Sequence, residues 1–120
     1  MKIIVYEDRK WERFHMEHTI RKTSPKAELS TFAKTTEALE YVREHQPEVA
    51  FVSVENVDGR GFFLIKKMKK ISPNTNVIVV ASRYRFLEEL NELRISGYVT
   101  EDFTEEKVNE EMACLRYVCT

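Results

Sequence analysis

The chain has 120 residues, a length typical of one compact domain, and 42% of them are hydrophobic. Its 19 Lys and Arg residues almost balance its 20 Asp and Glu residues, so the formal net charge is −1. This balance argues against a protein whose main role is to coat DNA or an anionic membrane. Apolar residues recur in periodic runs, which argues against disorder.

No targeting or membrane-spanning segment is expected. The first apolar run, residues 3–5, is too short for the core of a signal peptide or for a membrane span. Cys114 and Cys119 fall late in one predicted helix, where their spacing points them in different directions and would strain a disulfide. A reducing cytoplasm therefore fits this chain best.

Five short apolar segments predict β-strands, and they alternate with five longer segments of helical period. The strands are expected at residues 2–6, 27–32, 49–54, 76–81 and 96–100. The first, third and fourth are almost continuously apolar, which is typical of parallel strands covered by helices on both faces, whereas the second is mixed and predicts an edge strand. The helical stripes are Trp11, Phe14 and His18; Ala38, Leu39 and Val42; Leu64, Met68 and Ile71; Phe86, Leu90 and Leu93; and Val108, Met112 and Leu115.

This alternation predicts an α/β fold with a parallel sheet and right-handed crossovers. Five βα units are too few for a TIM barrel, so we expect an open, flavodoxin-like three-layer αβα sandwich with strand order 2-1-3-4-5. Residues 1–120 would form one domain, either free-standing or the front of a longer protein. The last helix is expected to begin at Thr104, with Phe103 and Val108 as a hydrophobic staple.

In such a sheet, ligands bind beyond the carboxyl ends of the strands, at the point where the strand order reverses. The candidate site is therefore made of the residues that end or follow the strands. They are Glu7 and Asp8 after the first, Ser53 at the end of the third, Ala81 and Ser82 at the end of the fourth, and Glu101 and Asp102 after the fifth.

These positions carry a resemblance that covers nearly the whole chain. Glu7 and Asp8 match a paired acid, and residues 47–69, PEVAFVSVENVDGRGFFLIKKMK, align without a gap with a segment of the form PDVVFLDIEMPGMDGFELLKKIK. SPNTNVIVV matches the run into a fourth strand, and GYVTEDF takes the place of DYLLKPF. The chain thus resembles a CheY-like receiver domain of a response regulator, most of all the receivers that precede LytTR-type DNA-binding domains. Tyr98 falls at the aromatic switch position of that family, and Gly61 matches its loop glycine.

The departures from the family pattern concern its chemistry. The resemblance implies an Asp at the end of the third strand that takes a phosphoryl group from a kinase phosphohistidine, and this chain has Ser53 there. Ala81 replaces the Thr or Ser that hydrogen-bonds the phosphoryl group, although Ser82 could partly substitute. Glu101 replaces the Lys that pairs with it. The prolines that follow the Lys and the phosphoacceptor are replaced too, by Asp102 and Val57.

These replacements have physical consequences. A serine hydroxyl is a poor nucleophile without a base, and the three histidines, His15, His18 and His45, lie in predicted helices rather than at strand ends. A dianionic phosphoryl group about 5 Å from the Glu101 carboxylate would meet a repulsion of about 3 kcal/mol per unit charge at an effective dielectric constant near 20. We therefore expect neither ordinary aspartyl phosphorylation nor a phosphoacceptor role for Ser53, and no enzymatic activity.

The negative charge of the paired acids, Glu7 and Asp8, could be compensated in two ways. Glu7 and Asp8 could hold Mg²⁺, weakly because Ser53 supplies no third carboxylate, or arginines could neutralise them, which the sequence slightly favours. The candidate arginines are Arg60, Arg83 and Arg85. His15 and His18 have no third metal ligand in view and are interpreted as structural, and Trp11 is expected to pack beside the acid pair.

The leading hypothesis is a pseudo-receiver that acts in signal transduction or transcription regulation through protein contacts. The resemblance implies a homodimer or partner surface on the fourth helix, fifth strand and fifth helix, and DNA binding only through a following output domain. The exposed candidates on this surface are Arg94, Glu105, Lys107, Glu111 and Arg116. The alternatives are phosphorylation on Asp58 or Glu55, and a flavin or other small-ligand site on the same fold.

Overall fold

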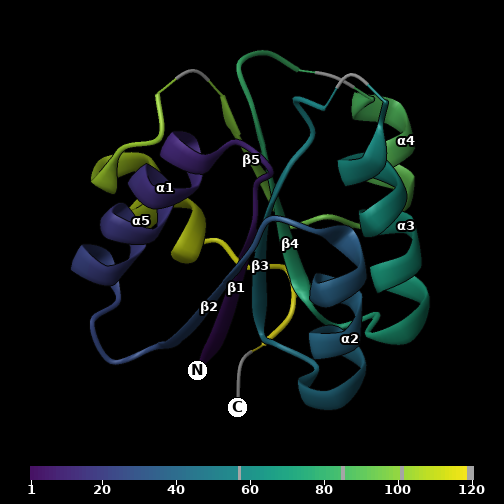
Figure 1. Ribbon diagram of the computed structural model, residues 1–120, viewed down its shortest axis with the longest axis horizontal. Helices are drawn as coiled ribbons and strands as arrows, with labels where there is room; N and C mark the ends of the chain where they lie inside the picture. Colours follow the sequence, from purple (N-terminus) through teal and green to yellow (C-terminus); the bar gives the residue numbers. More distant parts are fainter. Residues whose placement is uncertain (57, 85, 101, 119–120) are drawn as a thin grey trace.

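The computed structural model describes residues 1–118 except 57, 85 and 101, and shows five strands that alternate with five helices (Figure 1). The strands are β1 (Lys2–Tyr6), β2 (Glu28–Phe32), β3 (Val49–Ser53), β4 (Asn76–Ala81) and β5 (Gly97–Thr100). The helices are α1 (Lys10–Thr23), α2 (Thr35–His45), α3 (Arg60–Ile71), α4 (Leu87–Glu92) and α5 (Glu105–Met112). All five predicted strands are present, with boundaries that agree within one residue.

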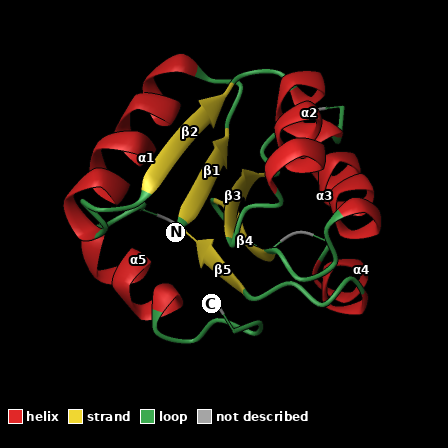
Figure 2. Cartoon of the chain, turned by 90° about the horizontal axis from the view of Figure 1, so that it is seen from below, coloured by secondary structure: helices red, strands yellow, loops and turns green. Residues whose placement is uncertain are grey.

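The strands form one parallel sheet in the order β2-β1-β3-β4-β5, which confirms the predicted topology. Helices α1 and α5 cover one face of the sheet, and α2, α3 and α4 cover the other (Figures 1 and 2). The order reverses between β1 and β3, so the loops after these two strands meet at one end of the sheet.

Two apolar cores, one on each face of the sheet, hold the three layers together. Ile3 and Val5 of β1 point to the α1 and α5 side, whereas Ile4 and Tyr6 point to the α2 and α3 side. Strands β1, β3 and β4 lie between both cores, which is why their sequences are apolar without a break. The edge strand β2 has no fully buried residue, in agreement with its mixed sequence.

The last helix begins as predicted and ends early. Thr104 caps α5, because its Oγ1 accepts a hydrogen bond from the Lys107 N–H at 3.2 Å, and Phe103 and Val108 are buried in one core. Helix α5 ends at Met112, so the expectation that Cys114 lies within it is wrong. Cys119 lies outside the described residues.

Asn76 at the start of β4 and Lys69 of α3 bind the segment after α5, residues 113–118. The Tyr117 N–H donates to Asn76 Oδ1 at 2.7 Å, and Asn76 Nδ2 donates to the Tyr117 carbonyl at 2.9 Å. Lys69 places its ammonium 4.6 Å from the centre of the Tyr117 ring. These contacts compete with further helical hydrogen bonds and account for the early end of α5. In the described part of the chain, no helix is long and apolar enough to cross a membrane.

Candidate functional site

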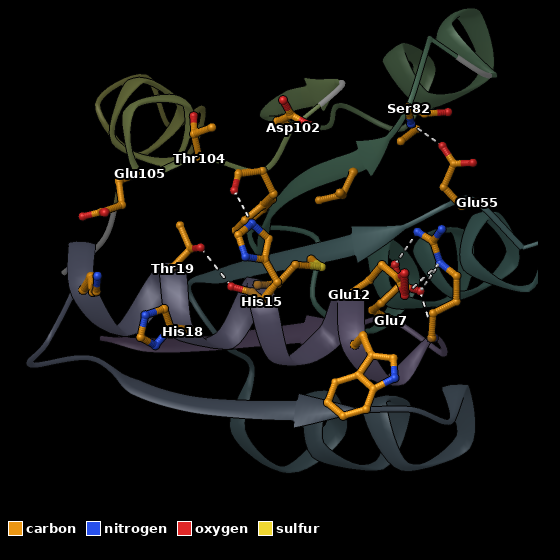
Figure 3. A pocket seen from close by; sticks show the side chains of 17 residues that line it. Glu7, Glu12, His15, His18, Thr19, Glu55, Ser82, Asp102, Thr104 and Glu105 are labelled. Carbon is orange, nitrogen blue, oxygen red and sulfur yellow. Dashed lines mark hydrogen bonds and ion pairs between the residues drawn. The ribbon is translucent and has the colours of Figure 1, made fainter.

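A groove of about 940 Å³ opens at the ends of the strands (Figure 3). One of its walls is α1, and the others are the segments that follow β3, β4 and β5. Of the residues that the sequence marks as candidates, Glu7, Ala81, Ser82 and Asp102 line it. The groove lies at the end of the sheet to which the topological rule points.

Glu7 is buried, with 1% of its side chain exposed, and an arginine neutralises it. Arg9 donates from Nη2 to Glu7 Oε1 at 2.9 Å and from Nε to Oε2 at 3.3 Å, and its backbone N–H donates to Oε2 at 3.1 Å. The pKa of Arg9 is raised, first because of the hydrogen bond to Glu7, and its charge is further favoured by Glu12 and Glu55. Arg13 donates to the Glu7 carbonyl at 2.9 Å.

The arginine that pairs with Glu7 is therefore not one that the sequence singled out. Arg60 binds Asp58 instead, with Nε at 2.9 Å from Oδ1 and 2.8 Å from Oδ2. Arg83 is exposed, and Arg85 lies outside the described residues. Arg9 follows Glu7 by two residues, and a short local spacing of this kind is the signal that could have identified it.

Asp8, the second acid of the pair, is half-buried. Its charge reaches the buried Tyr6 hydroxyl, whose pKa is raised to about 12, first by burial and then by Asp8. It also favours the charged form of Arg60, although the main cause of the raised Arg60 pKa is Asp58. Among the described residues, no group of three or more Asp, Glu, His or Cys side chains could hold a metal ion.

Ser53 ends β3 and is fully buried. Its Oγ accepts a hydrogen bond from the Glu55 N–H at 3.4 Å. The first turn of α3 packs tightly behind it, since a Cβ on Gly61 would lie 2.0 Å from the Ser53 carbonyl oxygen and 2.6 Å from Asn56 Oδ1. The glycine at position 61 is thus required by a close backbone approach rather than by an unusual backbone angle.

The groove histidines stand on α1, away from Ser53. His15 Nε2 lies 2.8 Å from the Phe103 carbonyl oxygen, which identifies it as a structural contact between α1 and the segment before α5. His18 lines the groove and is exposed. Neither ring is hydrogen-bonded to Ser53. Among the described residues, the Ser53 hydroxyl has its one hydrogen bond with the Glu55 N–H.

Glu55 is a site residue that sequence analysis considered only as an alternative phosphoacceptor. Its carboxylate accepts a hydrogen bond from the Ser82 N–H, across the gap between the ends of β3 and β4 (Figure 3). Ala81 is buried beside this contact, and Ser82 is exposed. Ser82 therefore supplies a backbone donor at the position where the sequence suggested that its hydroxyl would act.

Trp11 lines the groove but does not pack into it. Its side chain is 72% exposed, and its ring meets the Phe14 ring edge-to-face at 5.8 Å. The expectation that Trp11 packs beside the acid pair is therefore wrong. Glu101 and Val57, two of the positions that depart from the family pattern, lie outside the described residues, and Asp102 is exposed at the groove wall.

No family model matches the chain, but relatives and solved structures do. It is 17% identical to the sensory transduction protein LytT of Bacillus subtilis over 110 residues, which cover 92% of this chain and 46% of LytT. It is 27% identical to the transcriptional regulatory protein PhoP of Escherichia coli K12 over 117 residues, which cover 96% of this chain and 52% of PhoP. The chain thus spans about half the length of these curated relatives.

Solved structures agree with these relatives. The chemotaxis protein CheY4 of Vibrio cholerae superposes with a TM-score of 0.78 at 19% identity, over 93% of this chain and 95% of CheY4. A LuxR-family DNA-binding response regulator from Staphylococcus aureus gives 0.79 at 21% identity, over 93% and 95%. The chain has the fold of a CheY-like receiver domain. The similarity in sequence and in structure strongly supports a receiver domain of the response-regulator kind.

The surface expected to contact a partner is partly used within the chain. Tyr98 is half-buried, and its ring meets the Tyr84 ring at 5.1 Å and 61°. Lys107 donates from Nζ to the Thr100 carbonyl at 2.7 Å. Arg116 donates from Nε to the Ile95 carbonyl at 3.0 Å.

Glu111 also faces the sheet. Burial raises the pKa of its carboxyl, while a hydrogen bond from the Tyr98 N–H acts in the opposite direction. A Cβ on Gly97 would lie 1.9 Å from Glu111 Oε2, so the small glycine leaves room for this carboxylate against β5. Of the five candidates for this surface, Arg94, Glu105 and Arg116 are exposed, and Glu105 lines the groove.

Proposed function

We propose that this chain is a pseudo-receiver: a receiver domain that signals through protein contacts and does not use aspartyl phosphorylation. The observation that carries the proposal is the residue at the end of β3. Ser53 occupies the phosphoacceptor position of the aligned receiver segment, and it is fully buried with its Oγ held by the Glu55 N–H. No base contacts this hydroxyl in the described residues, so it is not activated for attack.

The acidic residues after β1, with Ser53 beside them, do not fit the Mg²⁺ ion that receiver chemistry uses. Both carboxylate oxygens of Glu7 accept hydrogen bonds from Arg9, which leaves Asp8 and a serine hydroxyl at a place where Mg²⁺ prefers several oxygen ligands. At most, Asp8 would hold the ion weakly. The proposal therefore includes no step through a metal and no resident cofactor.

The other acidic residues near β3 are poorly placed as acceptors. Asp58 is exposed, and its carboxylate is bound by Arg60, whose hydrogen bonds lower the Asp58 pKa and occupy its oxygens. The Glu55 carboxylate is bound to the Ser82 N–H. A flavin or another small ligand is the second alternative, and a colourless purified protein would count against a flavin.

Intact-mass measurement tests the proposal directly. The protein is incubated with acetyl phosphate and Mg²⁺, and we expect no stable addition of one phosphoryl mass. The Ser53→Ala, Asp58→Asn and Glu55→Gln variants serve as matched controls, because a gain in mass that one of them removes would identify the acceptor. Such a gain in the wild-type protein would overturn the pseudo-receiver.

The role of the whole protein follows from its relatives as a proposal. LytT is a sensory transduction protein and PhoP a transcriptional regulatory protein, and both are about twice as long as this chain. We propose a cytoplasmic signalling or transcription regulator in which DNA binding belongs to another domain. Its protein partner, or a second copy of the chain, would bind the surface of α4, β5 and α5, where Arg94, Glu105 and Arg116 are exposed.

A further inference from the structure

Glu55 joins the ends of two neighbouring strands, and the proposed function leaves this contact unused. Glu55 lies two residues after the end of β3, and Ser82 directly follows β4. The Glu55 N–H donates to Ser53 Oγ at 3.4 Å, while the Glu55 carboxylate accepts from the Ser82 N–H. One residue thus contacts both strand ends, through its backbone N–H at Ser53 and through its carboxylate at Ser82; Figure 3 shows the contact with Ser82.

The surroundings favour an oxygen anion at this place. A backbone N–H that donates to a carboxylate makes a charge-assisted hydrogen bond, which is stronger than a bond between neutral groups. The Arg9 guanidinium lies in the same groove, and the Glu55 charge is one of the causes of its raised pKa. A donor and a cation therefore act on the same carboxylate.

The contact between Glu55 and Ser82 is also connected to β5, through Tyr84. Ser82 is two residues before Tyr84, and the Tyr84 ring packs against the Tyr98 ring of β5 with the ring centres 5.1 Å apart. Tyr98 in turn donates its N–H to Glu111 of α5. The loop that Glu55 holds is therefore the loop that sets Tyr84 against β5.

We propose that Glu55 is an internal anionic ligand of this site, whose carboxylate binds the Ser82 N–H and holds the loop after β4 in one arrangement. The proposal rests on the proposed function, since it names what sets the state of a receiver that takes no phosphoryl group. The ligand is part of the chain, so the arrangement needs no kinase. An external oxyanion would have to displace Glu55 before it could use the same donor.

Amide hydrogen exchange measured by NMR tests this role. In Glu55→Ala we expect the Ser82 amide to exchange about tenfold faster than in the wild type, because its acceptor is lost. Glu55→Gln keeps an acceptor oxygen without the charge, and its Ser82 amide should exchange at an intermediate rate. We also expect Glu55→Ala to shift the ring resonances of Tyr84 and Tyr98.

The matched control is Glu12→Ala, which removes a carboxylate from the same groove without touching Ser82. Its Ser82 amide should stay within about twofold of the wild-type exchange rate, since its hydrogen bond is intact. The amide of Val79, inside β4, reports whether each variant is folded. A Ser82 amide that exchanges at the wild-type rate in folded Glu55→Ala and Glu55→Gln would overturn the internal ligand, as would unshifted tyrosine rings.

The two proposals fail separately. Phosphorylation of the wild-type protein would overturn the pseudo-receiver and leave the protection of Ser82 by Glu55 standing. A Ser82 amide indifferent to Glu55 would overturn the internal ligand and leave the absence of phosphorylation standing.

Discussion

Replacing Arg9 by Met should lower the free energy of unfolding, because it leaves the buried Glu7 carboxylate without its partner. The substitution removes two side-chain hydrogen bonds from Glu7, whose side chain is 1% exposed, and leaves one from the Arg9 backbone N–H. Breaking a fully buried ion pair costs about 3–5 kcal/mol. Because the Arg9 side chain is 49% exposed, we discount this to about 2 kcal/mol for the free energy of unfolding.

Urea denaturation of the wild type, Arg9→Met, Glu7→Gln and the double variant gives the coupling between the two side chains. Removing Glu7 as well should relieve most of the loss, so we expect a coupling energy of about 1–2 kcal/mol. In thermal unfolding, the single Arg9 variant should melt about 6–10 °C below the wild type for a domain of this size.

Arg21→Met is the matched control. Arg21 and Glu17 form an ion pair at 3.1 Å on the exposed surface of α1, with side chains 56% and 32% exposed. Loss of this pair should cost less than about 0.5 kcal/mol. The reasoning on Glu7 would be refuted if Arg9→Met lowered the free energy of unfolding by no more than Arg21→Met does.

Three further predictions concern single contacts. Gly61→Ala would place a methyl group against the Ser53 carbonyl and should destabilise the protein by about 2 kcal/mol in urea denaturation; wild-type stability would contradict the close approach. Burial lowers the Lys69 pKa to about 8 in the folded protein, below its unfolded value of 10.5, so the unfolded chain binds more protons between these values and stability rises with pH there. Relative to Lys69→Met, the wild type should gain about 1 kcal/mol from pH 7.5 to 9.5, discounted for the partly exposed ammonium, and a flat difference would contradict this pKa. Thr104→Ala should cost about 1 kcal/mol in the same assay through the lost Lys107 N–H contact, whereas Thr104→Ser should restore it.

The strands could be predicted because burial on both faces leaves a direct trace in the sequence. Residues 76–81 read NVIVVA, and all six are buried in β4. The end of α5 left no such trace. The helical stripe of α5 continues to Leu115. The hydrogen bonds that hold Tyr117, however, are made with Asn76, which lies 41 residues earlier in the sequence. A contact over that distance cannot be read from local periodicity.

The candidate site was predicted in position but not in pairing. Strand order alone brings Glu7, Ser53 and Ser82 to one edge, so sequence analysis could name them. That Glu7 pairs with Arg9 rather than with Arg60 depends on side-chain geometry. Arg60 binds Asp58 and Arg9 binds Glu7, in each case the carboxylate two residues earlier in the chain. Both arginines use the same local spacing, so the spacing does not tell which pair belongs to the site. Glu7 and Arg9 line the groove, whereas Asp58 and Arg60 line a separate pocket.

These pairings change the reason for expecting no phosphoryl chemistry. An uncompensated Glu7 carboxylate would repel a phosphoryl group as well, but Arg9 compensates its charge, so Glu7 adds little to the repulsion. The nucleophile is unaffected by this compensation, because Ser53 is buried with its hydroxyl held by the Glu55 N–H. The Ser82 N–H is already bonded to the Glu55 carboxylate, so a phosphoryl group would compete with a tethered anion for it. The case against phosphorylation thus rests on an inert nucleophile and an occupied donor more than on net charge.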